Sequence, residues 1–131
     1  MQVLCRSREG VLTQSWSEDG GISWSPIMPT HVPNPNAGAD AITLADGRHL
    51  LVYNHTQKNG PFPNGRNMLN IALSEDGRSW KPVITLERAP GEYSYPAVIQ
   101  TSDGFIHIAY TWKRQSIKHV AIDPNKLNSI P

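Results

Sequence analysis

The chain has 131 residues, enough for one domain with a hydrophobic core. Its 12 Lys and Arg balance 11 Asp and Glu, so the net charge of +1 gives no electrostatic case for nucleic acid or an anionic membrane as partner. No apolar run approaches the roughly 20 residues that cross a bilayer. The single Cys5 excludes an internal disulfide, and the five His lack ligand spacing, so neither a metal nor another cofactor is expected.

Abundant Gly and Pro, without helical periodicity, predict an all-β chain of ten strands. Three strands are expected within residues 1–30: Gln2–Cys5, Val11–Trp16 and Trp24–Met28. Four are expected within residues 40–88: Asp40–Leu44, His49–Asn54, Met68–Ser74 and Lys81–Glu87. Three more are expected within residues 94–124: Tyr95–Thr101, Ile106–Thr111 and Ile117–Ile122. The end of the chain, Asn125–Pro131, shows no pattern.

Two of these strands lead into the same turn motif. Residues 17–24 read Ser-Glu-Asp-Gly-Gly-Ile-Ser-Trp, and residues 74–80 read Ser-Glu-Asp-Gly-Arg-Ser-Trp. In such a turn, Ser and Asp side chains bond backbone N–H groups, Gly allows positive φ, and Trp covers the outside. The residues expected to hold the two turns are Ser17, Asp19, Gly21, Trp24, Ser74, Asp76, Gly77 and Trp80.

The motifs belong to a repeat. Ser17 and Ser74 are 57 residues apart (74 − 17), and the pair Asp46-Gly47 returns as Asp103-Gly104 at the same spacing (103 − 46). A period slightly above 50, with several short strands in each unit, predicts propeller blades rather than a helical solenoid. The alternative is two similar hairpins in a β-sandwich.

The order of strands also predicts which rim of the blades carries function. In an up-and-down blade, the two turn motifs and the Asp-Gly turns lie on one edge, and the long irregular loops lie on the opposite edge. The loops are Arg6–Gly10, Pro29–Ala39, His55–Asn67, Ala89–Ser94 and Trp112–Ser116. Functional groups commonly lie on such loops, and converging arginines suit a carboxylate, sulfate or phosphate. The alternative is that exposed loops are simply polar.

The candidate ligand-binding residues on this rim and at its border are Arg6, Arg8, Asn36, Asp40, His55, Arg66, Tyr95 and Arg114. Asn34, Glu92 and Lys113 lie on the same loops. His31 and Tyr93 also lie on these loops. A histidine there can simply be bonded to solvent or backbone, and a tyrosine there can pack at the junction of two blades.

The turn motifs resemble the Asp-box, or BNR repeat, of sialidase-like β-propellers. This resemblance implies a partial six-bladed propeller of four-stranded antiparallel blades. The chain would form about half of it, two to three blades at its C-terminal side. The blade within 40–88 would be complete, and those within 1–30 and 94–124 incomplete.

Sialidases bind the sugar carboxylate with three arginines and use a tyrosine, paired with a glutamate, as nucleophile. The resemblance matches Arg66 to the third arginine and Arg6 to the second, with Arg8 as a substitute. It matches Tyr93, in the segment Glu92–Pro96, to the nucleophile. The first arginine, the general-acid aspartate and the partner glutamate have no counterpart in this chain.

The leading prediction is a fragment of an exo-acting, sialidase-type glycoside hydrolase with an acidic oligosaccharide as partner. Residues 111–114 read Thr-Trp-Lys-Arg where sialidases usually have an acidic residue. The alternative is therefore a uronate-directed polysaccharide lyase or another glycosidase, with His31 and Tyr93 transferring protons. A third hypothesis is a non-catalytic carbohydrate-binding propeller module, since fold alone does not fix function.

The chain begins at what reads as the second strand of a blade, so we expect further blades to be encoded upstream. The first residues contain no signal peptide, although proteins of this kind are often periplasmic or secreted, and the location of the protein stays open. A partial ring exposes apolar faces and strand edges. We therefore expect two copies to associate through their end sheets.

Overall fold

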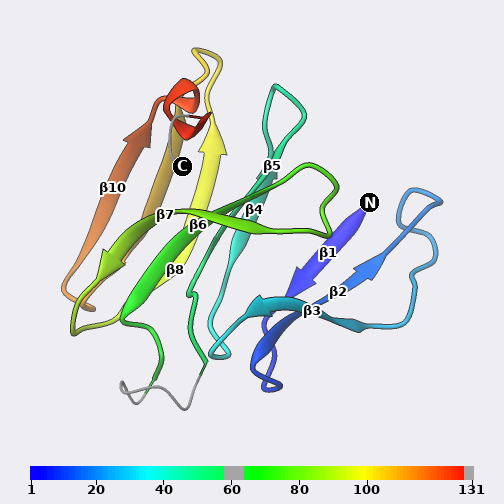
Figure 1. Cartoon of the computed structure of the whole chain (residues 1–131), viewed down its shortest axis with the longest axis horizontal. Coiled ribbons are helices and arrows are strands. Elements are labelled where there is room, and N and C mark those ends of the chain that lie inside the picture. The colour runs from blue at the N-terminus through cyan, green and yellow to red at the C-terminus, as the bar shows by residue number, and fades with distance from the viewer. Residues whose placement is uncertain (58–63, 129–131) are drawn as a thin grey trace.

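The computed structural model describes residues 1–57 and 64–128, which form ten strands in three antiparallel sheets (Figure 1). The first sheet contains β1 (Gln2–Cys5), β2 (Val11–Trp16) and β3 (Met28–Pro33). The second contains β4 (Asp40–Thr43), β5 (His49–Tyr53), β6 (Met68–Ser74) and β7 (Lys81–Arg88). The third contains β8 (Tyr93–Gln100), β9 (Ile106–Trp112) and β10 (Ser116–Ile122). Part of the expected loop His55–Asn67 and the last three residues lie outside this description.

The second sheet lies between the other two, and its central strands β5 and β6 are buried on both faces. On one face, Leu51 and Tyr53 of β5 pack with residues of the first sheet such as Leu12. On the other face, Leu50 and Val52 pack with residues of the third sheet. Successive residues of a strand point to opposite faces, so a strand with apolar residues at every position needs a partner on each side. Three sheets packed in series are blades of a propeller, which confirms the predicted fold and makes the β-sandwich alternative wrong.

Both Asp-box turns are held by their own side chains. In the second turn, the Gly77 N–H donates to Ser74 Oγ (2.8 Å), and the Ser79 N–H donates to Asp76 Oδ1 (2.7 Å). In the first turn, Gly21 N–H donates to Ser17 Oγ (2.8 Å), and Asp19 Oδ1 accepts from the Ile22 and Ser23 N–H groups.

These hydrogen bonds favour the charged carboxylate. They lower the pKa of Asp19 to about 2, chiefly through the Ser23 hydroxyl, and that of Asp76 to about 2, chiefly through the Ser79 N–H.

The two Asp-box tryptophans differ because only one lies between blades. Trp80 is 7% exposed and packs with Leu12 and Val32 between the first and second sheets. Trp24 is 42% exposed, and its indole N–H donates to the Gly21 carbonyl (3.1 Å). Exposed apolar side chains also lie on the outer faces of the first and third sheets, including Val3, Ile99 and Ile117. Association of two copies through these faces stays a prediction.

One expected strand is wrong in position. Trp24–Met28 was expected in the first group, whereas β3 runs from Met28 to Pro33 and pairs Gln14 with Met28. The Ser25 side chain accepts the Trp16 N–H (3.0 Å), so residue 25 closes the turn instead of extending the ladder. Prolines are tolerated in β3 because it is an edge strand.

Residues 124–128 form a regular element that the sequence does not predict. A short 3-10 helix, η1 (Pro124–Asn128), follows β10. Its Leu127 is 3% exposed and belongs to the core between the second and third sheets.

Candidate functional site

Three side chains from three different sheets meet on the rim opposite the Asp-boxes. Arg6 directly follows β1, Arg66 precedes β6, and Tyr95 lies in β8. Strand β6 separates Arg66 from the second Asp-box by seven residues, roughly 20 Å of extended chain. An open hollow of about 520 Å³ is lined by Arg6, Pro35, Asn36, Asn64, Arg66, Glu92, Tyr95 and Arg114. The strands thus separate two rims: one carries the Asp-box turns, and the opposite one carries this hollow and is called the ligand rim below.

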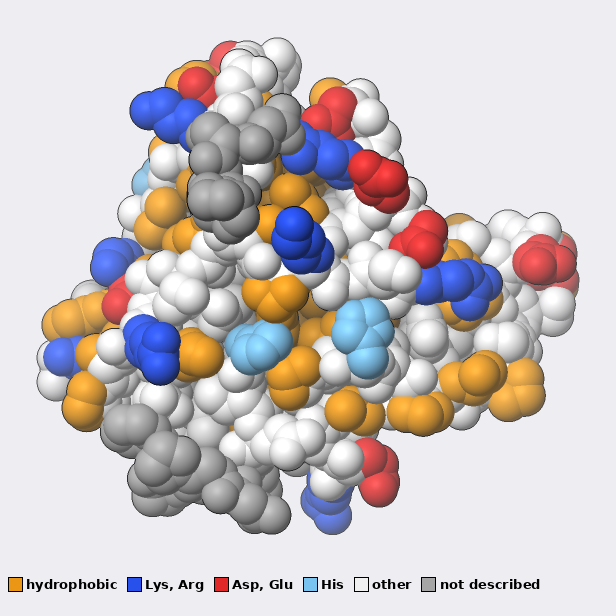
Figure 2. Space-filling model, in the orientation of Figure 1, with side chains coloured by type: hydrophobic (Ala, Val, Ile, Leu, Met, Phe, Trp, Pro, Cys, Tyr) orange, Lys and Arg blue, Asp and Glu red, His pale blue; other side chains and the backbone are white. Residues whose placement is uncertain are grey.

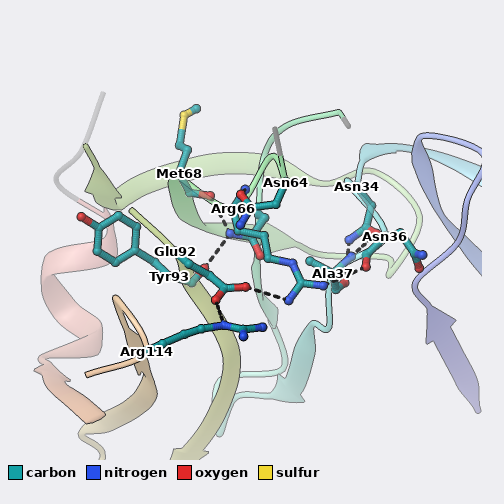
Figure 3. A network of polar contacts seen from close by, with 10 residues as sticks. Asn34, Asn36, Ala37, Asn64, Arg66, Met68, Glu92, Tyr93 and Arg114 are labelled. Carbon is teal, nitrogen blue, oxygen red and sulfur yellow. Dashed lines mark hydrogen bonds and ion pairs between the residues drawn. The ribbon is translucent and has the colours of Figure 1, made fainter. Parts of the chain in front are cut away.

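Arg66 is the centre of this hollow. Its Nη1 lies 3.1 Å from Glu92 Oε1, and its Nη2 donates to the carbonyl oxygen of Asn36 (3.3 Å). Its guanidinium carbon lies 5.3 Å from the centre of the Tyr95 ring. Glu92 also forms an ion pair with Arg114, so this carboxylate stands between two guanidinium groups (Figure 3). The Arg66 side chain is only 13% exposed, which holds its orientation before any ligand arrives.

Local contacts of the backbone place Arg66 there. Its N–H donates to Asn64 Oδ1 (2.9 Å), which closes a tight turn before β6. Gly65 has φ of +67°, and a Cβ at that position would lie 2.6 Å from the Cβ of Pro35. The carbonyl of Arg66 accepts the Tyr93 N–H (2.8 Å), which ties this turn to the start of β8. Asn54 adds a second tie, since its Nδ2 donates to the carbonyls of Met68 (2.9 Å) and Tyr93 (2.8 Å).

A buried asparagine shapes the loop that carries Asn36. Asn34 is fully buried, and its side chain donates to the Ala37 carbonyl (2.9 Å) and accepts the Ala37 N–H (3.1 Å). This turn presents Asn36 Oδ1 to Arg6 Nε (3.0 Å). Asn36 therefore contacts Arg6 through its side chain and Arg66 through its carbonyl oxygen. It fixes the distance between the two arginines.

Tyr95 presents its phenol to these arginines from an unusual backbone position. Its φ is +52°, at the register shift between Ser94 and Ala97 in the β8–β9 pairing, and 54% of the residue is exposed. Hydrogen bonding from Arg66, together with the charge of Arg66 and smaller contributions from Arg6, lowers the pKa of the Tyr95 hydroxyl below its ordinary value. A phenol whose anion is favoured is a better nucleophile and a better proton donor.

Tyr93 lies elsewhere, which corrects the expectation that it faces the rim. Only 1% of it is exposed, and it packs in the core cluster that includes Tyr110. Its hydroxyl donates to the Pro90 carbonyl (3.3 Å), and its ring points away from Glu92 (Figure 3). Its environment is that of a packing tyrosine at the junction of two blades, and Tyr95 lines the hollow instead.

Four other candidate residues lie outside the hollow. His31 is in β3, where its Nε2 lies 3.3 Å from the Trp80 carbonyl oxygen, beside the end of an Asp-box. Asp40 Oδ2 accepts the Val98 N–H (2.9 Å) and joins β4 to β8. His55 Nδ1 is hydrogen-bonded to the Tyr53 hydroxyl, and burial lowers the pKa of His55. Arg8 lines an adjacent hollow together with Asn34 and Asn36.

The surface gives no sign of a polyanion partner on the face in Figure 2, where basic, acidic and apolar side chains are interspersed. Within residues 1–57 and 64–128, no helix is long and apolar enough to cross a bilayer. In the same residues, no group of three or more His, Cys, Asp or Glu side chains is placed to hold a metal ion.

Serial blades with Asp-box turns on one rim and arginines on the other define a sialidase-like β-propeller, of which this chain forms a part. The chain belongs to the BNR repeat-like domain family, whose model matches residues 1–108. No protein of curated function matches it.

The solved structures that are similar to the chain include two intramolecular trans-sialidases. One is the intramolecular trans-sialidase from Ruminococcus gnavus in complex with oseltamivir carboxylate, with a TM-score of 0.76 and 22% identity. The other is the leech intramolecular trans-sialidase complexed with 2,7-anhydro-Neu5Ac, with a TM-score of 0.75 and 16% identity. The likeness covers 99% and 98% of this chain but only 31% and 22% of those chains. The chain therefore spans less than a third of either structure.

Proposed function

We propose that the chain is part of a sialidase-type glycosidase that acts on acidic glycans, with Arg6 and Arg66 binding the substrate carboxylate. The observation that supports this most is the convergence of Arg6, Arg66 and Tyr95 from three sheets on one hollow. Guanidinium groups bind carboxylates through paired N–H donors. Of the two similar structures, one holds oseltamivir carboxylate, a ligand with a carboxylate group, and the other holds 2,7-anhydro-Neu5Ac.

In this proposal Tyr95 is the nucleophile. A neutral phenol can approach a substrate that carries a carboxylate without the repulsion an anionic nucleophile would meet, and Arg66 stabilises the phenolate as it forms. The proton of the Tyr95 hydroxyl passes to a base as its oxygen attacks the anomeric carbon, and the bond to the leaving oxygen breaks as an acid protonates that oxygen. Water then attacks the anomeric carbon, which breaks the bond to Tyr95, releases the sugar and restores the phenol. Proton transfer to the leaving group requires an acid from outside the described residues.

A second candidate is a carbohydrate-binding module. In the described part of the chain no carboxylate is bonded to the Tyr95 hydroxyl, because Glu92 is engaged by Arg66 and Arg114. Binding needs only the arginines, whereas catalysis needs a base for Tyr95. The uronate-directed lyase has less support, since His31 and Tyr93, its expected proton carriers, lie outside the hollow.

A trapping experiment separates these functions. A 3-fluorosialosyl fluoride forms a slowly hydrolysed glycosyl ester or ether with an enzyme nucleophile as fluoride departs, and peptide mapping by mass spectrometry then locates the adduct. We expect an adduct on Tyr95 that is lost in Tyr95→Phe and kept in Tyr93→Phe. Ligand-induced NMR shifts around Arg66 without any adduct would favour the binding module. An absence of both would overturn the proposal.

A further inference from the structure

The hollow carries more positive charge than one carboxylate ligand can neutralise. Its charged lining residues, among those the structure describes, are three arginines and one glutamate, a net charge of +2 (3 − 1). The buried pair Arg66 and Glu92 compensates itself, and Arg6 with Arg66 suits one carboxylate. After such a ligand has bound, the net charge of the site is still positive because of Arg114. The remaining positive charge of the site therefore favours the binding of a second anionic group.

Arg114 is held in place by a strained turn. Lys113 and Arg114 have φ of +54° and +55°, and the Gln115 N–H donates to the Trp112 carbonyl (3.0 Å). Turns with two such residues normally use Asn and Gly, because other side chains are disfavoured there. All four non-glycine residues with positive φ in residues 1–57 and 64–128 lie on this rim: Asn36, Tyr95, Lys113 and Arg114. Strain of this kind persists at sites where a side chain must be aimed.

Two contacts hold this turn against the rest of the hollow. The Lys113 N–H donates to the Glu92 carbonyl (2.7 Å), and Arg114 Nε is bonded to the Glu92 carboxylate. The Lys113 ammonium lies 4.5 Å from the centre of the Trp112 ring, so it is drawn onto the aromatic face. Arg114, in contrast, keeps 73% of its side chain open to solvent. Its two terminal amino groups can therefore form a bidentate contact with an oxyanion.

We propose that Arg114 binds a second anionic group of the substrate, next to the carboxylate held by Arg6 and Arg66. The group is an oxyanion, either a sulfate ester on the same sugar or the carboxylate of a neighbouring acidic sugar. The preferred substrates are then glycans with two closely spaced negative charges. This inference rests on the proposed function, because it places the first carboxylate at Arg66.

The test is a set of affinities measured by calorimetry on the whole chain with three ligands. They are the methyl glycoside of N-acetylneuraminic acid, a sulfate ester of that glycoside, and a disialyl disaccharide. We expect Arg114→Asn to weaken a dianionic ligand about tenfold and the monoanion less than twofold. Asn tolerates positive φ, so this variant keeps the turn. Lys113→Asn is the matched control, with less than a twofold effect on all three.

The outcomes separate the role proposed for Arg114 from the proposed function of the chain. Loss confined to the sulfated ligand identifies a sulfate ester, and loss confined to the disaccharide identifies a second acidic sugar; both support the proposal. Equal weakening of all three ligands by Arg114→Asn, or equal wild-type affinities for monoanion and dianions, overturns it. If the proposed function itself is wrong, none of the three ligands binds the wild-type chain and Arg66→Gln changes nothing.

Discussion

The two rims of the blades use similar polar residues in opposite ways. On the Asp-box rim, the aspartate of each Asp-box is satisfied within its own turn, as when Asp76 accepts the Arg78 and Ser79 N–H groups. On the ligand rim, bonds join residues far apart in sequence, such as Arg6 with Asn36 and Arg66 with Glu92. Local bonds stabilise a hairpin and need no other blade. Bonds between blades form only when the blades pack, so they depend on the complete fold. They hold charged side chains of different blades around one hollow.

The contrast between the rims shows which parts of a repeated blade can recur and which must differ to form a single site. Every blade can repeat its Asp-box because that turn is self-contained. The opposite loops cannot repeat, because each contributes one member to a single set of contacts. We therefore expect changes on the ligand rim to alter binding more than stability, and changes on the Asp-box rim to do the reverse.

The largest effect is expected for Arg66→Gln. We expect the affinity for a monocarboxylate sugar such as sialic acid methyl glycoside to fall about 100-fold, since a charged, prearranged donor pair is lost. The free energy of unfolding should fall by about 1–3 kcal/mol, because the pair with Glu92 is largely buried, although Glu92 keeps Arg114 as partner. Calorimetric titration and thermal unfolding measure both. Arg8→Gln is the control, because Arg8 lines the adjacent hollow. An equal loss of affinity in that variant would mean that the net charge of the rim, and not the position of Arg66, determines binding.

Gly65→Ala should lower both the stability of the chain and its affinity for the ligand. A Cβ at residue 65 would lie 2.6 Å from the Pro35 Cβ at a φ of +67°, so the turn must shift and carry Arg66 with it. We expect about 2–3 kcal/mol of lost stability and roughly tenfold weaker binding. Gly104→Ala is the matched control: its φ is +90° but nothing lies within 4 Å. Unchanged binding in Gly65→Ala would mean that this packing does not position Arg66.

Ser74→Ala should lower stability and leave binding intact. It removes the acceptor of the buried Gly77 N–H, at a cost of about 1–2 kcal/mol, or roughly 3–6 °C in Tm. Ser17→Ala, in the first and more exposed turn, should cost less because water can reach the Gly21 N–H. Thermal unfolding measures the difference. A change in ligand affinity comparable to that of Arg66→Gln would contradict the separation of the rims.

The smallest expected effect is a lowered pKa of the Tyr95 hydroxyl, which a titration of the tyrosines measures. Tyr95 should ionise before Tyr53 and Tyr110, because Arg66 and Arg6 lower its pKa, whereas burial raises the pKa of the other two. Absorbance at the phenolate band should therefore show a transition below about pH 10 that Tyr95→Phe removes. Arg66→Gln should move this transition upward. A first transition that survives Tyr95→Phe would assign the perturbed phenol to another residue.

The sequence predicted the blades well because their signals are local. The repeat of 57 residues and the two Asp-boxes mark strand ends without knowledge of the partners. The position of β3 was missed because Pro29 and Pro33 suggested a loop, and only the sheet order shows that this strand is an edge that tolerates them.

The choice between two tyrosines could not be made from sequence. Simple alternation places Tyr93 and Tyr95 on the same face of a strand. The register shift and the φ of +52° at Tyr95 bury one and expose the other. The role of Glu92 was also hidden, since its partners, Arg66 and Arg114, lie 26 and 22 residues away. Asn34 and Asn64 belong to polar loops, and Asn54 ends an expected strand, so only the packed blades reveal their partners.

A crystal structure of the chain with a sialic acid glycoside tests the central claim most directly, namely that residues of three blades form one binding site. We predict the sugar carboxylate within about 3 Å of both the Arg6 and the Arg66 guanidinium groups, with the Tyr95 hydroxyl facing the anomeric carbon. A sugar bound on the Asp-box rim, or Arg66 and Tyr95 found on different surfaces, would contradict it.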